Sequence, residues 1–139
     1  MTFVDTNVLL YAICPGAQER AKAQTARAIL RRDDLCLSVQ VLQEFYVQAT
    51  RPTRTQPISH ADATALIALW LRFHVVELSV PVLQAALRIK ERYQTSYWDA
   101  AILAAAATAG CNEVLSEDLN PGQSYDPVRI LNPFAERKR

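Results

Sequence analysis

Short apolar segments rich in β-branched residues alternate with longer helical segments along the chain, and this alternation constrains the fold more than any other feature. Strands are predicted at 2–4, 35–38, 75–78, 113–116 and 128–131. Strands that are separated by helical crossovers pair in parallel, and the crossover helices cover the sheet. The sequence therefore predicts a three-layer α/β domain, in which helices cover both faces of a parallel sheet.

Small polar residues mark the starts of several helices. Ser59, Ser79 and Ser96 each precede a run of helix formers and are expected to cap it, while Thr6 or Asn7 caps the first short helix. The Ala-rich last helix ends at Gly110, a residue type favoured just beyond a helix C-terminus. We expect two helices to turn apolar stripes toward the core, formed by Leu66, Leu69, Trp70 and Phe73 and by Leu83, Leu87 and Ile89.

The composition indicates one soluble domain. The chain has 139 residues, 50% of them hydrophobic, and its 15 Lys and Arg nearly balance its 14 Asp and Glu. A chain with this much apolar surface can bury enough of it to offset the entropy lost on folding. The net charge of +1 excludes nucleic-acid binding by bulk charge alone. We expect a single domain at 1–134 and a disordered basic tail at 135–139. The longest apolar run, 100–107, is too short for a membrane span, so a cytoplasmic location is expected.

The few cysteines and histidines exclude two kinds of site. Cys14, Cys36 and Cys111 are odd in number and far apart, so we interpret them as free, buried thiols in a reducing compartment. His60 and His74 are the only histidines, and we expect them at the surface or in supporting positions. A disulfide framework and a zinc site built on Cys and His are therefore excluded.

Three acids stand alone in otherwise uncharged stretches of the chain. Asp5, Glu44 and Asp99 are the only charged residues within 1–18, 35–50 and 93–112. Charged side chains are seldom placed in apolar elements without a partner, so the three positions call for a common explanation.

The predicted topology supplies such an explanation by bringing the acids to one edge of the sheet. Asp5 ends the first strand and Asp118 follows the fourth, at the edge where open parallel sheets bind ligands. Asp99 lies in the first turn of its helix, and Glu44 flanks the apolar side of another. Converging carboxylates repel by roughly 4 kcal/mol per close pair at an effective dielectric near 20, so the cluster needs a cation or protonated members. Oxygen ligands alone favour Mg²⁺ or Mn²⁺, ions suited to phosphoryl chemistry.

Each acid also has a purely local explanation. Asp5 could cap the first helix, Asp99 could serve as a first-turn helix residue, and Glu44 could lie on a solvated helix face. Asp118 precedes Asn120 in a segment typical of a turn. Spacing alone does not decide between one shared site and four separate roles.

Five segments in sequence order resemble the motifs of PIN-domain ribonucleases. They are VDTNVL at 4–9, VLQEFY at 41–46, YWDAAI at 97–102, SEDL at 116–119 and ILNPF at 130–134. Each match alone is weak, but together they span the chain in register with the predicted elements. In its compact length the chain is most similar to the toxins of VapBC-type toxin–antitoxin modules.

The resemblance implies a fold and a set of functional residues. The sheet would have five parallel strands in the order 3-2-1-4-5, with the acids where the order reverses. Asp5, Glu44 and Asp99 would be the core metal-binding and catalytic acids, and Asp118 the more variable fourth. One or two Mg²⁺ or Mn²⁺ ions would support hydrolysis of RNA to 3′-hydroxyl and 5′-phosphate ends. Supporting residues that position water or phosphate would be Asn7 and Ser116.

The resemblance also implies an antitoxin partner and a toxin homodimer. Segment 66–73 could serve such interfaces, although core packing explains it equally well. Basic residues at 20–32, 51–54 and 88–92 could contact RNA phosphates or lie on solvated helix faces. Trp98, beside the third acid, is interpreted as a core residue in preference to a surface for base stacking.

Two alternatives come from other functional classes. The first is a Mg²⁺-binding phosphotransfer domain, either receiver-like or similar to haloacid dehalogenase-type phosphatases. The latter need an Asp at the position of Asn7, and both need a Lys after a late strand, where none occurs between Lys90 and Lys138. The second is a catalytically silent PIN-like binding module, against which the intact acids argue.

Overall fold

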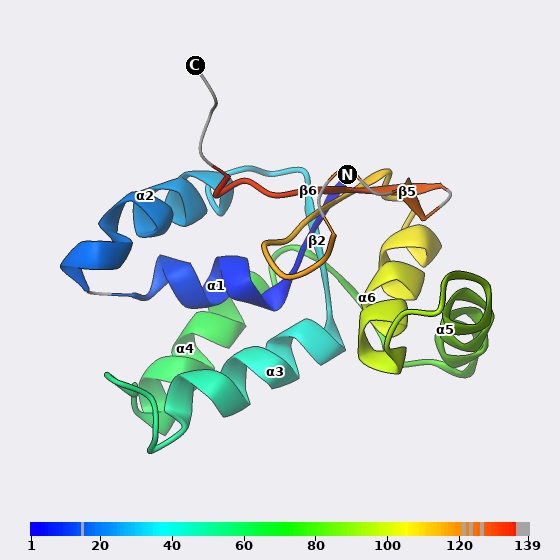
Figure 1. Cartoon of the computed structure of the whole chain (residues 1–139). Coiled ribbons are helices and arrows are strands. Elements are labelled where there is room, and N and C mark those ends of the chain that lie inside the picture. Colours follow the sequence, from blue (N-terminus) through cyan, green and yellow to red (C-terminus); the bar gives the residue numbers. More distant parts are fainter. Residues whose placement is uncertain (15, 121, 123, 126, 136–139) are drawn as a thin grey trace.

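A six-stranded sheet forms the centre of the computed structural model, which describes residues 1–14, 16–120, 122, 124–125 and 127–135 (Figure 1). Within these residues the strand order is β3-β2-β1-β4-β6-β5. The strands are β1 (Thr2–Val4), β2 (Leu35–Ser38), β3 (His74–Val76), β4 (Glu113–Leu115), β5 (Ser124–Tyr125) and β6 (Val128–Leu131). Phe3 of β1 pairs with Cys36 on one side and with Val114 on the other, both in parallel register.

The parallel part of the sheet confirms the predicted strand order, because β3, β2, β1, β4 and β6 are the five expected strands. The expected count of five strands is wrong. Ser124–Tyr125 adds a short antiparallel strand at the edge, with Tyr125 paired to Val128 of β6. A strand of two residues has no periodicity that a sequence can display. β3 also begins and ends earlier than expected, which leaves Leu78 exposed.

The helices occupy the predicted intervals between strands. They are α1 (Thr6–Ala12), the 3₁₀ turn η1 (Ala17–Glu19), α2 (Arg20–Ile29), α3 (Val39–Thr50), α4 (His60–Trp70), α5 (Val80–Tyr93) and α6 (Tyr97–Thr108). Ser59, Ser79 and Ser96 cap their helices as predicted, each accepting a hydrogen bond from the third helical N–H. The cap of α1 is Asp5, which corrects the expectation of Thr6 or Asn7.

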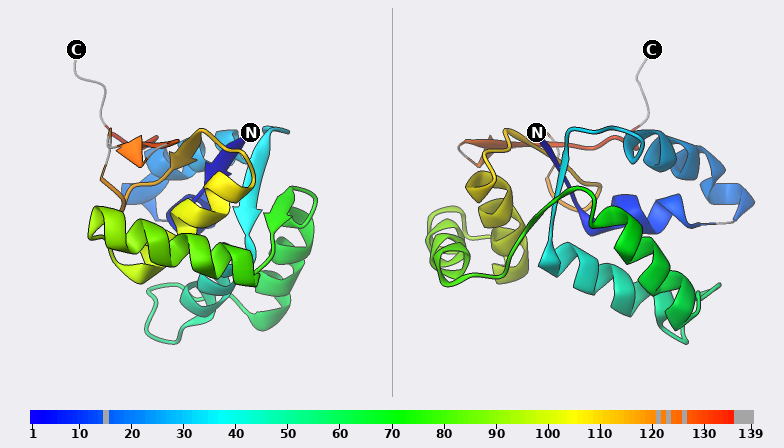
Figure 2. Two further views of the ribbon diagram at one scale, coloured as in Figure 1. Left: turned by 90° about the vertical axis from the view of Figure 1, so that its right-hand side faces the viewer. Right: turned by 180° about the vertical axis from the view of Figure 1, so that it is seen from behind.

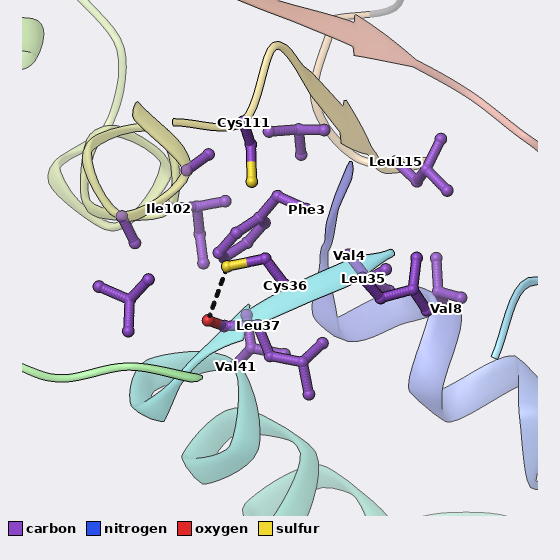
Figure 3. Packing of buried hydrophobic residues seen from close by; sticks show 14 of the residues in the cluster. Phe3, Val4, Val8, Leu35, Cys36, Leu37, Val41, Ile102, Cys111 and Leu115 are labelled. Atoms are coloured by element: carbon purple, nitrogen blue, oxygen red, sulfur yellow. Dashed lines mark hydrogen bonds between the residues drawn. The ribbon is translucent and has the colours of Figure 1, made fainter. Parts of the chain in front are cut away.

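Helices cover both faces of the sheet. Figures 1 and 2 show α5 and α6 on one face and α1 and α2 on the other, with α3 and α4 extending beyond the lower edge, where β1 and β2 end. In Figure 3, Phe3 and Cys36 point toward α6 and Ile102, whereas Val4 lies on the side of Val8 in α1. Every residue of β1 and β2 is buried, as expected for strands between two helical layers.

Two predicted apolar stripes are wrong in part. Leu83 and Leu87 are 44% and 52% exposed, and α5 instead turns Val82 and Ala86 inward. In α4 the buried residues are Ala63 and Trp70, whereas Leu69 is exposed and Phe73 follows the helix. Small side chains let α5 approach the Ala-rich α6 closely, so its larger leucines remain outside.

The cysteines are free, and Cys36 and Cys111 are buried as predicted. Cys14 is half-exposed, which corrects its expected burial. Among the described residues, no helix combines the length and hydropathy that a membrane crossing requires. Of the predicted disordered tail at 135–139, only the exposed Ala135 is described, and 136–139 lie outside the described residues.

The end of α6 provides a test of the fold. Gly110 has φ +77° and donates to the Ala107 carbonyl, while the Cys111 N–H donates to Ala106 in a Schellman motif. We predict that Gly110→Ala lowers the free energy of unfolding by about 1 kcal/mol, because a Cβ is strained at this φ although the surrounding space is open.

Urea denaturation measures this loss, and Gly16→Ala is the matched control. Gly16 has φ −68° and equally open surroundings, so its substitution should change stability by less than about 0.5 kcal/mol. Equal effects of the two substitutions would contradict the prediction.

Candidate active site

The carboxyl ends of β1 and β4 hold the centre of the candidate site. Asp5 follows β1 directly, and its backbone N–H donates to the Leu115 carbonyl at 3.0 Å. Ser116 follows β4, and its hydroxyl donates to Asp5 Oδ2 at 2.8 Å. The Asp5 side chain is thereby held between the two central parallel strands.

The Asp5 carboxylate is buried and has two roles. Its Oδ1 accepts the Thr6 N–H at 2.8 Å, which caps α1, while Oδ2 is held by Ser116. Burial, with a smaller contribution from the charges of Glu44 and Asp118, raises the pKa of Asp5 to about 6, although the two hydrogen bonds act to lower it. The local role of Asp5 as a helix cap and its place among the acids therefore coexist in one side chain.

Neutral donors from two helices, α1 and α3, hold Glu44. The Thr6 hydroxyl donates to Glu44 Oε2 at 2.7 Å, and Gln40 Nε2 donates to Oε1 at 3.0 Å. The same Gln40 amide donates to the Trp98 carbonyl in α6 at 3.3 Å. Sequence reasoning missed Thr6 and Gln40 as site residues. The four-residue spacing of Gln40 and Glu44 on a helix indicates that these two side chains can meet, whereas only the tertiary structure reveals the contact between Thr6 and Glu44.

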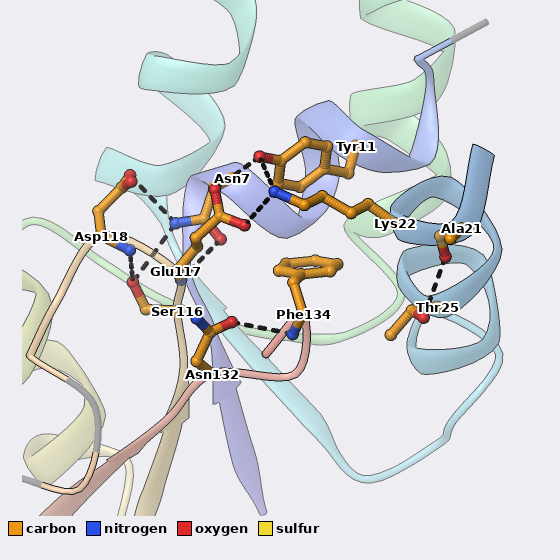
Figure 4. A network of polar contacts seen from close by, with 10 residues as sticks. All are labelled: Asn7, Tyr11, Ala21, Lys22, Thr25, Ser116, Glu117, Asp118, Asn132 and Phe134. Atoms are coloured by element: carbon orange, nitrogen blue, oxygen red, sulfur yellow. Dashed lines mark hydrogen bonds and ion pairs between the residues drawn. The ribbon is translucent and has the colours of Figure 1, made fainter. Parts of the chain in front are cut away.

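Asn7 and Ser116 lie beside Asp118, at the end of β4 (Figure 4). Asn7 Nδ2 donates to Asp118 Oδ2 at 3.1 Å and to Ser116 Oγ at 3.3 Å, while Asn7 Oδ1 accepts the Glu117 N–H. Ser116 Oγ accepts the N–H groups of Asp118 and Leu119 at 3.2 Å each. The structure thus places both supporting residues next to the acids, and their action on water or phosphate stays a prediction.

A charged clamp holds the same loop from the outside (Figure 4). Glu117 accepts hydrogen bonds from Tyr11 at 2.6 Å and from Lys22 at 2.8 Å, and the Lys22 amine also lies over the Tyr11 ring. Phe134 packs edge-on against that ring. The clamp joins α1, α2 and the segment after β6 to the loop that carries Asp118.

Asp99 lies at the margin of the site. It is half-buried in the first turn of α6, where its N–H donates to the cap Ser96. Its charge, together with the larger effect of burial, raises the pKa of Tyr125. The described charges that raise the pKa of Asp5 are those of Glu44 and Asp118, so these two acids lie within electrostatic reach of Asp5, whereas the charge of Asp99 acts on Tyr125.

The acids are not neutralised by cations from the described part of the chain. Its ion pairs are Lys22–Glu117, Arg32–Asp34 and Arg129–Glu113. An all-oxygen, negatively charged donor set fits a hard divalent cation in its chemistry. No group of three or more His, Cys, Asp or Glu among the described residues is close enough together to hold a metal ion, so these acids do not form a closed coordination sphere.

Several basic residues of the run at 20–32 are engaged within the protein. Lys22 belongs to the clamp, Arg27 Nε donates to the Ala12 carbonyl at 2.8 Å, and Arg32 pairs with Asp34. By contrast, Arg51 lines a hollow of about 370 Å³ that borders Glu44. Of the three basic groups in the sequence, the loop after α3 therefore lies nearest to a site acid in a shared hollow.

Trp98 also lines this hollow, and its position corrects a prediction. The indole was expected in the core, yet it is 65% exposed. Its neighbour Tyr97 faces it edge-on, with ring centroids 5.1 Å apart. The first turn of α6 thus presents an aromatic surface beside the candidate site.

Comparison with known proteins identifies the class of fold. The PIN domain family model matches residues 2–122, so the chain belongs to the PIN domain family. No curated protein matched the sequence closely enough to serve as a relative.

Solved structures share this fold at low sequence identity. A toxin–antitoxin complex from Klebsiella pneumoniae superposes with a TM-score of 0.71 at 16% identity, covering 96% of this chain and 98% of that one. FitAcB from Neisseria gonorrhoeae superposes with a TM-score of 0.69 at 18% identity, covering 96% of this chain and 99% of that one. VapC20 of Mycobacterium tuberculosis superposes with a TM-score of 0.66 at 21% identity, covering 85% of this chain and 92% of that one. It is described as a toxin that cleaves the sarcin–ricin loop.

The raised pKa of Asp5 predicts a pH dependence of stability. The unfolded carboxyl titrates near 3.8 and the folded one near 6, so the folded state binds the proton more tightly. As pH rises from 4 to 7 in EDTA, the wild-type protein should lose on the order of 3 kcal/mol of unfolding free energy relative to Asp5→Asn, which cannot ionise.

Urea titrations across this pH range measure the difference, with Asp33→Asn at an exposed turn as the control. The control should follow the wild-type curve. A constant difference between wild type and Asp5→Asn from pH 4 to 7 would show that folding does not raise the pKa of Asp5 and would contradict the prediction.

Proposed function

We propose that this chain is a metal-dependent endoribonuclease that acts as the toxin of a toxin–antitoxin module. One observation carries the proposal: the buried carboxylate of Asp5 lies beside Glu44 and Asp118 where the strand order reverses, without a cation from the described chain. Membership of the PIN family and the fold shared with a toxin that cleaves the sarcin–ricin loop support it.

The proposed cofactor is Mg²⁺ or Mn²⁺, as one or two ions. Asp5, Asp99, Asp118 and Glu44 would hold it, because carboxylate oxygens are the preferred ligands of these ions. When bound, such an ion neutralises charge on the phosphate and makes water a stronger nucleophile.

The side chains around the acids define the remaining chemistry. Gln40 and Thr6 hold one oxygen each of Glu44, which fixes the carboxylate in an orientation to accept a proton from attacking water. Asn7 and Ser116 supply an amide and a hydroxyl next to Asp118, where they would orient water or a phosphate oxygen. Helix α3 thus carries the proposed proton acceptor, and α1 and the end of β4 carry the groups that would position the substrate.

The proposed partners follow from the similar complexes. The Klebsiella pneumoniae structure is a toxin–antitoxin complex, and a FitAB structure is bound to a DNA fragment. We infer an antitoxin that covers the acids, and a toxin homodimer in the cytoplasm.

Cleavage of RNA tests the proposed function directly. The wild-type protein should cleave single-stranded RNA with Mg²⁺ or Mn²⁺ and lose cleavage in EDTA, while Asp5→Asn and Asp99→Asn should lower the rate by about 100-fold or more. Electrophoresis of end-labelled RNA measures the rate, and Asp33→Asn is the matched control for the loss of one negative charge.

A second readout is independent of turnover. Mn²⁺ should raise the melting temperature of the wild-type protein and have little effect on Asp5→Asn, since a cation that binds only the folded state stabilises it. Equal cleavage by all variants, or unchanged cleavage in EDTA, would refute the metal-nuclease proposal.

A further inference from the structure

The two tryptophans of the chain lie in opposite environments. Trp70 is 3% exposed and packs edge-on against Phe45, with centroids 4.7 Å apart. Trp98 is 65% exposed, although burial of an indole removes a large apolar surface from water. Tyr97 forms an edge-to-face pair with Trp98, and the indole remains largely exposed beside Glu44 in a shared hollow.

Gln40 ties this aromatic surface to the candidate active site. Its amide donates at once to Glu44 Oε1 at 3.0 Å and to the Trp98 carbonyl at 3.3 Å. One side chain therefore spans the distance between a site acid and the backbone of Trp98. Trp98 and Glu44 also line the same hollow, so the residue that carries the indole and a site acid border one space.

The hollow between Trp98 and Glu44 has the chemistry of a nucleotide site. Its volume is about 370 Å³, and its lining includes Gln43, Gln48 and Arg51. The described contacts leave these two amides and the guanidinium free of intramolecular hydrogen bonds and ion pairs. An aromatic face stacks any base, an amide pairs with a base edge, and a guanidinium binds phosphate.

A second hollow, of about 430 Å³, lies on the other side of Trp98 and has a different character. Leu78, Val80 and Leu83 line it together with the amide of Gln43 and the carboxylate of Glu77, so its described lining carries an acid and no cation that could bind a phosphate. Of these two hollows, the one shared with Glu44 adds the guanidinium of Arg51 to the indole and the amides.

We propose that Trp98 and the hollow beside it form a binding site for an unpaired nucleobase of single-stranded RNA. The base stacks on the indole, Gln43 or Gln48 contacts its edge, and Arg51 binds the adjacent phosphate. This inference rests on the proposed RNA substrate. A base site on Trp98 would select RNA that has an unpaired, extruded base, because a base stacked within a duplex has no free face for the indole.

Binding in EDTA tests the site without any cleavage. Fluorescence anisotropy of a labelled single-stranded RNA measures affinity for wild type, Trp98→Ala, Trp98→Phe and Arg51→Ala. Trp98→Ala should weaken binding about tenfold or more, Trp98→Phe should retain most of the affinity, and Arg51→Ala should weaken binding and reduce its salt dependence.

Controls separate stacking from general effects of substitution. Leu71→Ala removes an exposed apolar side chain outside the hollow, and Arg31→Ala removes a cation that lines a different surface hollow; both should bind RNA like wild type. An oligonucleotide of the same length with abasic sites should bind the wild-type protein about as weakly as RNA binds Trp98→Ala. It should also fail to quench the tryptophan fluorescence that the base-bearing strand quenches.

The outcomes distinguish this inference from the proposed function. Trp98-dependent binding without metal-dependent cleavage would retain the base site and refute the nuclease. Cleavage with equal affinity of wild type and Trp98→Ala, or equal binding of the abasic strand, would overturn the base site alone. Loss of affinity for a protein partner, with RNA affinity unchanged, would assign the indole to a protein interface and likewise overturn it.

Discussion

The buried carboxylate of Asp5 is the interaction on which the rest of the structure depends. It caps α1 through the Thr6 N–H and accepts the Ser116 hydroxyl at the end of β4, so one side chain joins the two central strands to the first helix. Burial raises its pKa to about 6, which means that its charge at neutral pH costs stability. A group that opposes folding while it organises the sheet edge is typical of functional sites.

The surrounding residues orient the acids without neutralising them. Thr6 and Gln40 hold Glu44, and Asn7 holds Asp118, all through uncharged donors. The cation of Lys22 is engaged with the neighbouring Glu117 instead. The fold thus distinguishes a structural acid, which is paired with a cation, from the candidate site acids, which form no ion pair within the described part of the chain.

Features set by the local chain were predictable, and features set by the approach of neighbouring elements were not. The serine caps, Gly110 and the parallel sheet follow from short-range chemistry and the alternation of elements, whereas the strand order was implied by the resemblance to PIN-domain ribonucleases. The leucines of α5 were assigned to the wrong face, because periodicity identifies apolar positions without showing which of them the small residues of α6 can admit. For the same reason Trp98 was placed in the core.

The sequence by itself determined which acids are candidates, because Asp5, Glu44 and Asp99 stand alone in uncharged stretches and Asp118 ends a strand. Only the tertiary structure decided how they relate. It places Glu44 and Asp118 within the electrostatic reach of Asp5, sets Asp99 to one side, and supplies Thr6 and Gln40 as partners from elsewhere. Hydrogen bonds between residues as distant as Thr6 and Glu44 depend on helix positions that no local pattern encodes, whereas an unpaired charge in an apolar segment is visible in the chain itself.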